Sequence, residues 1–202
     1  MSSNNYLFNA WKTCLEIIKD RGYEPDKAYS NLTESDLEYL TSENQLDIVS
    51  KNEEMKKIIC IKFITTEKVK SAYIKELAKE IKNNIPDCYT LEMIFVLKNK
   101  PNSSVKKLQK DPSLGDIQVR TCKELQINIT KHKWVPQHIK LEQDEINQLM
   151  EQYSLKSKNQ LPILLQSDAI ARYFNFKSGD VIKIPTSNGS LNTRYVNYRC
   201  VK

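Results

Sequence analysis

Residues of types that could support catalysis are present in this 202-residue chain, but their spacing offers no usable catalytic grouping. The only histidines, His132 and His138, stand on either side of Pro136 with no cysteine between them. Two imidazoles alone make a weak metal site, because a bound transition metal usually takes more ligands in a defined geometry. The chain also lacks a Ser/His/Asp grouping and a phosphate-cradling glycine loop. We therefore expect both histidines to be structural, with no metal and no cofactor.

A basic window from Lys98 to Lys110 is the first candidate for binding. It holds five lysines and no acid before Asp111. Because it follows a predicted buried strand, it should be a loop that enters a short helix. Backbone N–H groups at such a helix start, beside lysines, can meet a phosphate. A solvated lysine loop is the alternative, and the residues alone favour it.

The second candidate is the tail, from Asn159 to Val201, where apolar and aromatic residues alternate with Arg172, Arg194 and Arg199. The guanidinium group suits bidentate contacts with the carboxylates of a partner protein better than an ammonium group does. Solvated or locally salt-bridged arginines are the alternative. The residues by themselves leave both interpretations open.

The tail pattern predicts a helix, a strand, a loop and a second strand. Asp168 or Ser167 can cap the helix, and Gly179 supplies the positive φ of the turn that follows. Pro185 should end the first strand because it cannot donate to a ladder. In chain order, the elements are a short helix around Ala171, a strand at Val181–Ile184, a polar loop at Thr186–Thr193 around Asn188-Gly189, and a strand at Arg194–Val201.

The front of the chain should be an α/β unit. Hydrophobic periodicity predicts a strand, a helix and a strand within about forty residues, the pattern of a βαβ unit with parallel strands. A junction without helical pattern at Lys131–Lys140 separates this part from a helix at Glu142–Tyr153, so we place two domains at 1–131 and 132–202. The expected front elements are helices at Tyr6–Asp20, Ser35–Leu40 and Glu67–Asn83, and strands at Lys57–Ile64, Tyr89–Leu97 and Glu124–Ile129.

The net charge of +6 is mild, and His132–Lys202 contributes ten Lys and Arg against six Asp and Glu. Affinity for nucleic acid grows with the number of neutralised phosphates, so the chain alone should bind it poorly. A local contact inside a larger complex stays open.

Composition also bounds the compartment. No apolar run approaches the ~20 residues of a membrane span, and no secretory signal opens the chain, so we expect a cytosolic or nuclear protein. Five scattered cysteines without a Cys-x-x-Cys pair should be small buried hydrophobes in a reducing compartment. They are Cys14, Cys60, Cys88, Cys122 and Cys200.

Several segments occur in an order and spacing that closely resemble a known family. This is the fifth-largest subunit shared by eukaryotic nuclear RNA polymerases, whose C-terminal assembly domain has an equivalent in the archaeal RNA polymerase. Trp11 followed by Asp20–Tyr23 resembles the start of that family's N-terminal jaw domain more weakly. The C-terminal segments are Glu124–Thr130, Val135–Ile139, Asn159–Pro162, Ala171–Phe174 and Arg194–Arg199.

The chain departs from the family pattern at three places. Ser167–Ala169 stands where the family usually shows Gly-Asp-Pro, and Pro185–Tyr195 replaces a shorter Arg-x-Ser-x-Thr-Ala-Gly-Arg-Tyr loop. Lys100–Ser103 occupies the place of a Thr-Pro-Ser-Ala turn that lies close to downstream DNA in the family, and it keeps the proline.

The resemblance implies an architecture of α/β plus α+β. The N-terminal part would be a three-layer, restriction-endonuclease-like jaw, and the C-terminal part a small mixed α/β assembly domain. It further implies a non-catalytic, nuclear subunit of DNA-dependent RNA polymerase shared by polymerases I, II and III. The assembly domain would dock on the largest subunit, and the jaw would make sequence-independent backbone contacts with downstream duplex DNA.

The resemblance also assigns candidate residues. Those expected to face DNA are Lys100, Pro101, Asn102, Ser103, Ser104 and Lys106. Those expected to bind the partner subunit are Arg172, Tyr173, Arg194, Tyr195, Tyr198 and Arg199. We expect no small-molecule substrate and no membrane contact.

Because the family jaw has an endonuclease-like fold, a metal-dependent nuclease is the alternative, as is a free DNA-binding adapter. A nuclease site needs a strand-borne acid followed by Glu/Asp-x-Lys on the next strand. Pro86-Asp87 supplies an acid, but Glu54–Lys56 precedes it and Glu80–Lys82 falls on a predicted helix. We therefore expect no catalytic residues.

Overall fold

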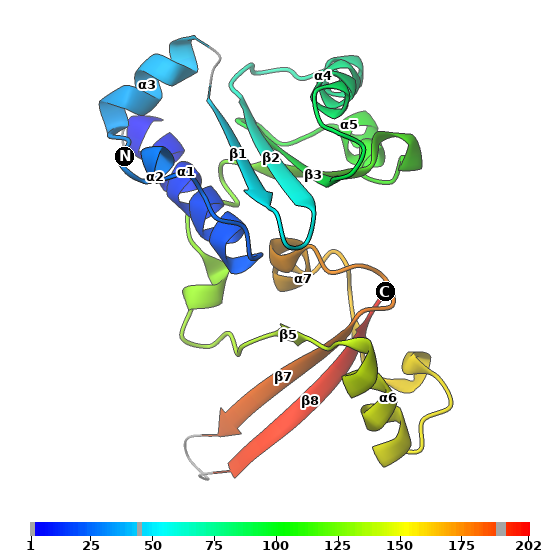
Figure 1. The fold of residues 1–202 in the computed structure, drawn as a ribbon. Coiled ribbons are helices and arrows are strands. Elements are labelled where there is room, and N and C mark those ends of the chain that lie inside the picture. The colour runs from blue at the N-terminus through cyan, green and yellow to red at the C-terminus, as the bar shows by residue number, and fades with distance from the viewer. Residues whose placement is uncertain (1–2, 44–45, 189–192) are drawn as a thin grey trace. The chain divides into compact units, whose positions relative to one another are not determined.

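The computed structural model describes residues 3–43, 46–188 and 193–202. They form two compact units, one ending at Ile127 and the other beginning at Asn128. Each unit contains one four-stranded sheet with helices (Figure 1), so the mixed α/β class expected from the sequence is confirmed. The domain boundary expected between residues 131 and 132 lies four residues after the division between these two units, and it stays a prediction.

The first unit is built on a sheet in which three of the four strands are parallel. The predicted strand–helix–strand arrangement is confirmed, because β2 and β3 pair in parallel over their full length. β4 extends the parallel sheet on the far side of β3, and β1 pairs antiparallel with β2 at the other edge. The strands are β1 (Asp47–Asn52), β2 (Lys57–Ile64), β3 (Thr90–Leu97) and β4 (Asp116–Thr121).

Helices cover both faces of this sheet (Figure 1), with α4 and α5 on one face and α1, α2 and α3 on the other. Ile74 and Ala78 of α4 pack with Phe95 in the core of the first face. On the second face, the Trp11 ring lies 5.7 Å from the Phe63 ring. The helices are α1 (Ser3–Asp20), α2 (Lys27–Ser30), α3 (Glu34–Ser42), α4 (Ser71–Asn83) and α5 (Ser103–Leu108), with a 3-10 turn at Pro112–Leu114.

Two expectations for the first unit are corrected. α4 begins at Ser71 rather than Glu67, because Val69 packs against the core and Lys70 is extended. The strand predicted at 124–129 is wrong, and the strand before it, β4, was missed. Gln126 donates through Nε2 to the carbonyl oxygens of Cys122 and Tyr6, which ties this segment into turns.

A buried arginine joins α1 to the sheet. Arg21 follows α1 directly, and its Nη1 and Nη2 donate to Glu92 Oε2 on β3 and Gln118 Oε1 on β4, each at 2.9 Å. The Arg21 and Glu92 side chains are only 4% and 16% exposed. Gly22 has a φ of +82°, the left-handed conformation that commonly ends a helix.

The second unit has the strand order β5-β7-β8-β6. Helices α6 and α7 pack on opposite faces of the sheet. Ile146 of α6 packs in a cluster with Val181, and Ala171 of α7 packs in a cluster with Ile182. Because Val181 and Ile182 are neighbours on one strand, their side chains point to opposite faces. The strands are β5 (Ile139–Lys140), β6 (Ile163–Leu164), β7 (Val181–Asn188) and β8 (Thr193–Val201); the helices are α6 (Gln143–Gln152) and α7 (Ala169–Phe174), with 3-10 turns at Ile129–Lys131 and Lys158–Gln160.

The tail elements largely follow the sequence pattern. Asp168 caps α7, since its Oδ1 accepts a hydrogen bond from the N–H of Ile170 at 2.8 Å. Gly179 takes the expected positive φ. The predicted end of the strand at Pro185 is wrong: β7 continues to Asn188, and the loop predicted over 186–188 is strand.

The continuation of β7 has a physical reason. Beyond Lys183, β7 pairs only with β8, because β5 pairs with Ile182 and Lys183 alone. Pro185 therefore lies at a sheet edge, where a missing N–H is tolerated. The expected turn at Asn188-Gly189 includes residues outside those that the structure describes. Among the helices described in the two units, none is both long and apolar enough to cross a bilayer.

Four of the five cysteines are buried as expected, but Cys88 is exposed. Burial raises the pKa of the Cys60 and Cys122 thiols to about 11, so both stay protonated near neutral pH.

We predict that iodoacetamide at about pH 8 adds one label to the folded protein, at Cys88, because only exposed thiolates react rapidly. Mass spectrometry should show no label on Cys88→Ser; rapid labelling of Cys60 in the folded chain would contradict this.

Arg21 provides a stability prediction. Arg21→Ala should leave Glu92 as a buried, unpaired charge and lower the free energy of unfolding of the first unit by about 3–5 kcal/mol. A Trp134→Phe background leaves Trp11 as the single tryptophan, so its fluorescence in a denaturant titration reports on this unit alone. Replacing Arg21 and Glu92 together by Met should restore most of the loss, and equal losses in both variants would refute the ion-pair explanation.

Candidate nucleic-acid interface and partner surface

The basic window begins directly after β3. Residues 98–102 form a loop and α5 starts at Ser103, so the expected loop entering a short helix is confirmed. Asn102 caps α5: its Oδ1 accepts a hydrogen bond from the N–H of Val105 at 2.8 Å. One of the N–H donors at this helix start is therefore already engaged within the protein.

The residues expected to face DNA lie together in this loop and in α5. Five are exposed and Pro101 is half-buried. Neither Lys100 nor Lys106 forms an ion pair with any residue in the described parts of the chain. Both ammonium groups are thus available to an external anion. Contact with DNA itself stays a prediction.

Two lysines that sequence reasoning missed share a cavity with this loop. The lysine cavity, of about 310 Å³, is lined by Thr66–Lys70 after β2 and by Leu97 and Asn99–Asn102 at the end of β3. Lys68 and Lys70 precede the basic window by about thirty residues, so the sequence did not indicate that they lie beside it in the fold. The predicted parallel pairing of the two strands could have indicated this proximity, because the loops after neighbouring parallel strands meet at one sheet edge.

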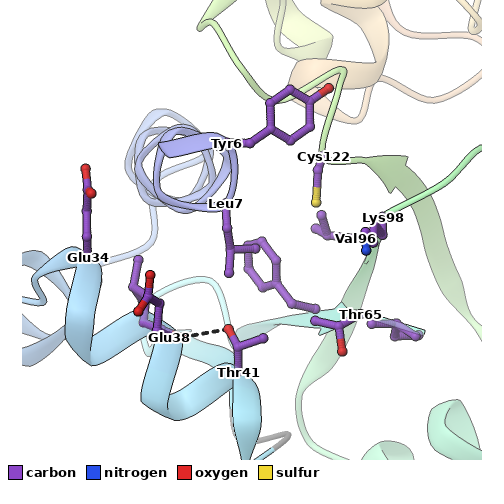
Figure 2. Close-up of a pocket in the computed structure, with 12 residues that line it drawn as sticks. Tyr6, Leu7, Glu34, Glu38, Thr41, Thr65, Val96, Lys98 and Cys122 are labelled. Atoms are coloured by element: carbon purple, nitrogen blue, oxygen red, sulfur yellow. Dashed lines mark hydrogen bonds between the residues drawn. The ribbon is translucent and has the colours of Figure 1, made fainter. Parts of the chain in front are cut away.

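A second cavity, of about 340 Å³, lies between α1, α3 and the carboxyl ends of the strands (Figure 2). Leu7, Phe63 and Val96 contribute apolar lining, while Glu34 and Glu38 of α3 bring two carboxylates. The hydroxyl of Thr41 donates to the carbonyl oxygen of Leu37 at 2.6 Å, within its own helix. With two carboxylates against the single ammonium group of Lys98, this apolar cavity does not attract phosphate.

The residues considered for a nuclease do not converge. Glu80 lies on α4 as expected, and Asp87 is exposed in the turn before β3. Neighbouring strands do carry Glu92 and Gln118, but the guanidinium of Arg21 binds both. Within the described residues, no group of three His, Cys, Asp or Glu side chains is placed to hold a metal ion.

Both histidines engage nearby backbone. His132 Nδ1 accepts from the N–H of Trp134 at 3.3 Å, and His138 Nδ1 lies 2.8 Å from the carbonyl oxygen of Pro136. The structural role expected for both histidines stays a prediction.

The candidate partner residues of β8 lie on both faces of the hairpin that β7 and β8 form. Tyr195 is 48% exposed and shares a face with Arg199, whose Nη1 donates to the carbonyl oxygen of Ile163 at 3.1 Å. Tyr198 lies on the other face, where its ring contacts that of Tyr153 edge-on at 6.2 Å. The side chain of Arg194 is outside those that the structure describes.

Tyr173 requires a correction. It was expected to bind a partner, but its side chain is 4% exposed and its hydroxyl accepts a hydrogen bond from Asn128 Nδ2 at 2.9 Å. Tyr173 therefore connects α7 to the start of the second unit instead of presenting its ring outward. Its neighbour Arg172 is half-buried on the same helix.

Comparison with known proteins identifies both parts of the chain. Residues 2–81 match the family model described as RNA polymerase Rpb5, N-terminal domain, and residues 127–201 match RNA polymerase Rpb5, C-terminal domain. Subunit 5C of DNA-directed RNA polymerase V from Arabidopsis thaliana is 32% identical, over 96% of this chain and 83% of the relative. Subunit RPABC1 of DNA-directed RNA polymerases I, II and III from Caenorhabditis briggsae is 29% identical, over 96% and 95%. The chain therefore belongs to the Rpb5 family of RNA polymerase subunits.

Proposed function

We propose that this chain is a non-catalytic structural subunit of nuclear DNA-dependent RNA polymerase, shared by polymerases I, II and III. The observation that carries the proposal is the presence of both Rpb5 domains on one chain, in the same order as their names imply. Support also comes from the alignment with a relative named as a subunit of all three polymerases, over 95% of that relative. A nuclear location is part of the same proposal.

The second unit docks on the largest subunit in this proposal. Among the described residues, no third strand pairs with β7 beyond Lys183, and Tyr195 and Val196 are 48% and 42% exposed in this part of the hairpin. Permanent interfaces concentrate their binding energy in aromatic and arginine side chains. Tyr195, Tyr198, Arg199, Arg172 and Arg194 are the proposed contacts, and Tyr173 holds α7 in place through its hydrogen bond with Asn128.

The first unit serves as a jaw beside downstream duplex DNA. Its parallel sheet with helices on both faces is compatible with the three-layer, restriction-endonuclease-like architecture that we propose for it. Lys100, Pro101–Ser104 and Lys106 would meet backbone phosphates, which carry no sequence information. Catalysis is not part of this role, because Arg21 engages the strand-borne carboxylate of Glu92.

Copurification tests the assembly role. A tagged copy should recover the large polymerase subunits, whereas recovery as a lone monomer would refute the proposal. Tyr195→Ala and Arg199→Ala should each weaken recovery of the largest subunit, since losing an interface hot spot costs about 2 kcal/mol, or roughly 30-fold in affinity. Tyr73→Ala is the matched control, because Tyr73 lies on α4 of the first unit and is 44% exposed.

Retention of downstream DNA tests the jaw. Polymerase assembled with Lys98, Lys100, Lys106 and Lys107 replaced by Ala should keep its subunits but release a downstream duplex more readily, with a salt dependence lower by about 0.9 per lost contact. Alanine at the exposed residues Lys19, Lys27, Lys51 and Lys123 is the control.

If the variant with four lysines replaced retains the downstream duplex as well as the unmodified polymerase does, the basic loop is solvated and does not contact DNA. The nuclease alternative has its own readout: metal-dependent cleavage by the isolated chain, abolished by Asp87→Ala, would reverse the assignment.

A further inference from the structure

The lysine cavity is formed by two loops that the sheet holds in place. β2 and β3 end in register, with Ile64 opposite Leu97, so both loops start from the same edge. Asn99 Nδ2 donates to the carbonyl oxygen of Glu67 at 3.2 Å, which joins the two loops directly. The N–H of Lys98 also donates to the carbonyl oxygen of Ile64, at 3.4 Å. The cavity walls are therefore anchored to paired strands on both sides.

The charges around this cavity favour an anion. Lys68, Lys70 and Lys100 line it against the single carboxylate of Glu67. All three lysines are exposed, and in the parts of the chain that the structure describes none forms an ion pair. Three ammonium groups around one concave surface, with one acid among them, leave an excess of positive charge for a ligand.

The chemistry of the lining selects a backbone phosphate over a compact substrate. Lysine ammonium groups act as point charges that attract phosphate without fixing its orientation. Val69, Leu97 and Pro101 supply apolar contacts, which suit the sugar parts of a nucleic-acid backbone. Side chains on long flexible stems at an open cavity fit a chain that passes across both loops.

We propose that the lysine cavity seats a phosphate of duplex DNA and that Lys68 and Lys70, on the loop between β2 and α4, are its additional contacts. This inference rests on the proposed placement of the first unit beside downstream DNA. It extends the DNA-facing surface from one loop to two and adds residues that the sequence did not indicate.

Fluorescence anisotropy with the full chain and a labelled duplex of about 20 base pairs tests the inference at about 20 mM salt, where weak phosphate contacts are strongest. Lys68→Ala/Lys70→Ala should lower the slope of log K against log salt by about 1 to 2 and weaken binding roughly tenfold at low salt. The loss should be equal on two unrelated sequences. Lys68→Arg/Lys70→Arg should keep the slope, and Lys19→Ala/Lys51→Ala is the matched control.

The outcomes separate this inference from the proposed function. If Lys100→Ala/Lys106→Ala lowers the slope but Lys68→Ala/Lys70→Ala does not, the second loop is not a contact while the jaw role stands. If no lysine pair changes the slope, or the unmodified chain shows no salt-dependent binding, the inference is refuted, and the jaw role is then decided by retention of the downstream duplex in assembled polymerase. Trp11 fluorescence checks that each variant remains folded, and an unfolded alanine variant is replaced by Lys68→Gln/Lys70→Gln, for which the same slope change is expected.

Discussion

Parallel pairing of β2, β3 and β4 is the constraint on which the candidate DNA surface depends. Parallel strands end at the same edge of a sheet, so the segments that leave them must lie side by side. Residues 66–70 and 98–102 meet for this reason, although about thirty residues and a whole helix separate them. A positive surface with few lysines thus forms on a chain whose net charge is only +6.

The polar residues of the strands serve the same sheet. Glu92 and Gln118 lie on neighbouring parallel strands, and Arg21 binds both, which fixes the end of α1 against β3 and β4. Pairing with a guanidinium offsets the desolvation cost that a buried carboxylate would otherwise carry alone. These polar strand residues therefore have a structural role within an otherwise apolar core, and the binding chemistry that we propose for the first unit lies in its exposed loops.

One end of the sheet in the second unit is covered by helices, and residues further along its hairpin are exposed. α6 and α7 cover opposite faces near Val181 and Ile182, where the short strands β5 and β6 flank the hairpin. Further along the hairpin, Tyr195 and Val196 stay exposed. Both side chains are available to the partner subunit that we propose for this unit.

Local sequence determined most of the helices and the four longest strands, β2, β3, β7 and β8, because periodicity, the Asp168 cap and Gly22 act over a few residues. It also carried the family resemblance and the basic window from Lys98 to Lys110. The turns after Cys122 and the passage of β7 through Pro185 depended on tertiary contacts and on a vacant sheet edge. Likewise, only the folded chain decided that Tyr173 is buried and that Lys68 and Lys70 join the basic loop, since burial and proximity arise from strand pairing between distant segments.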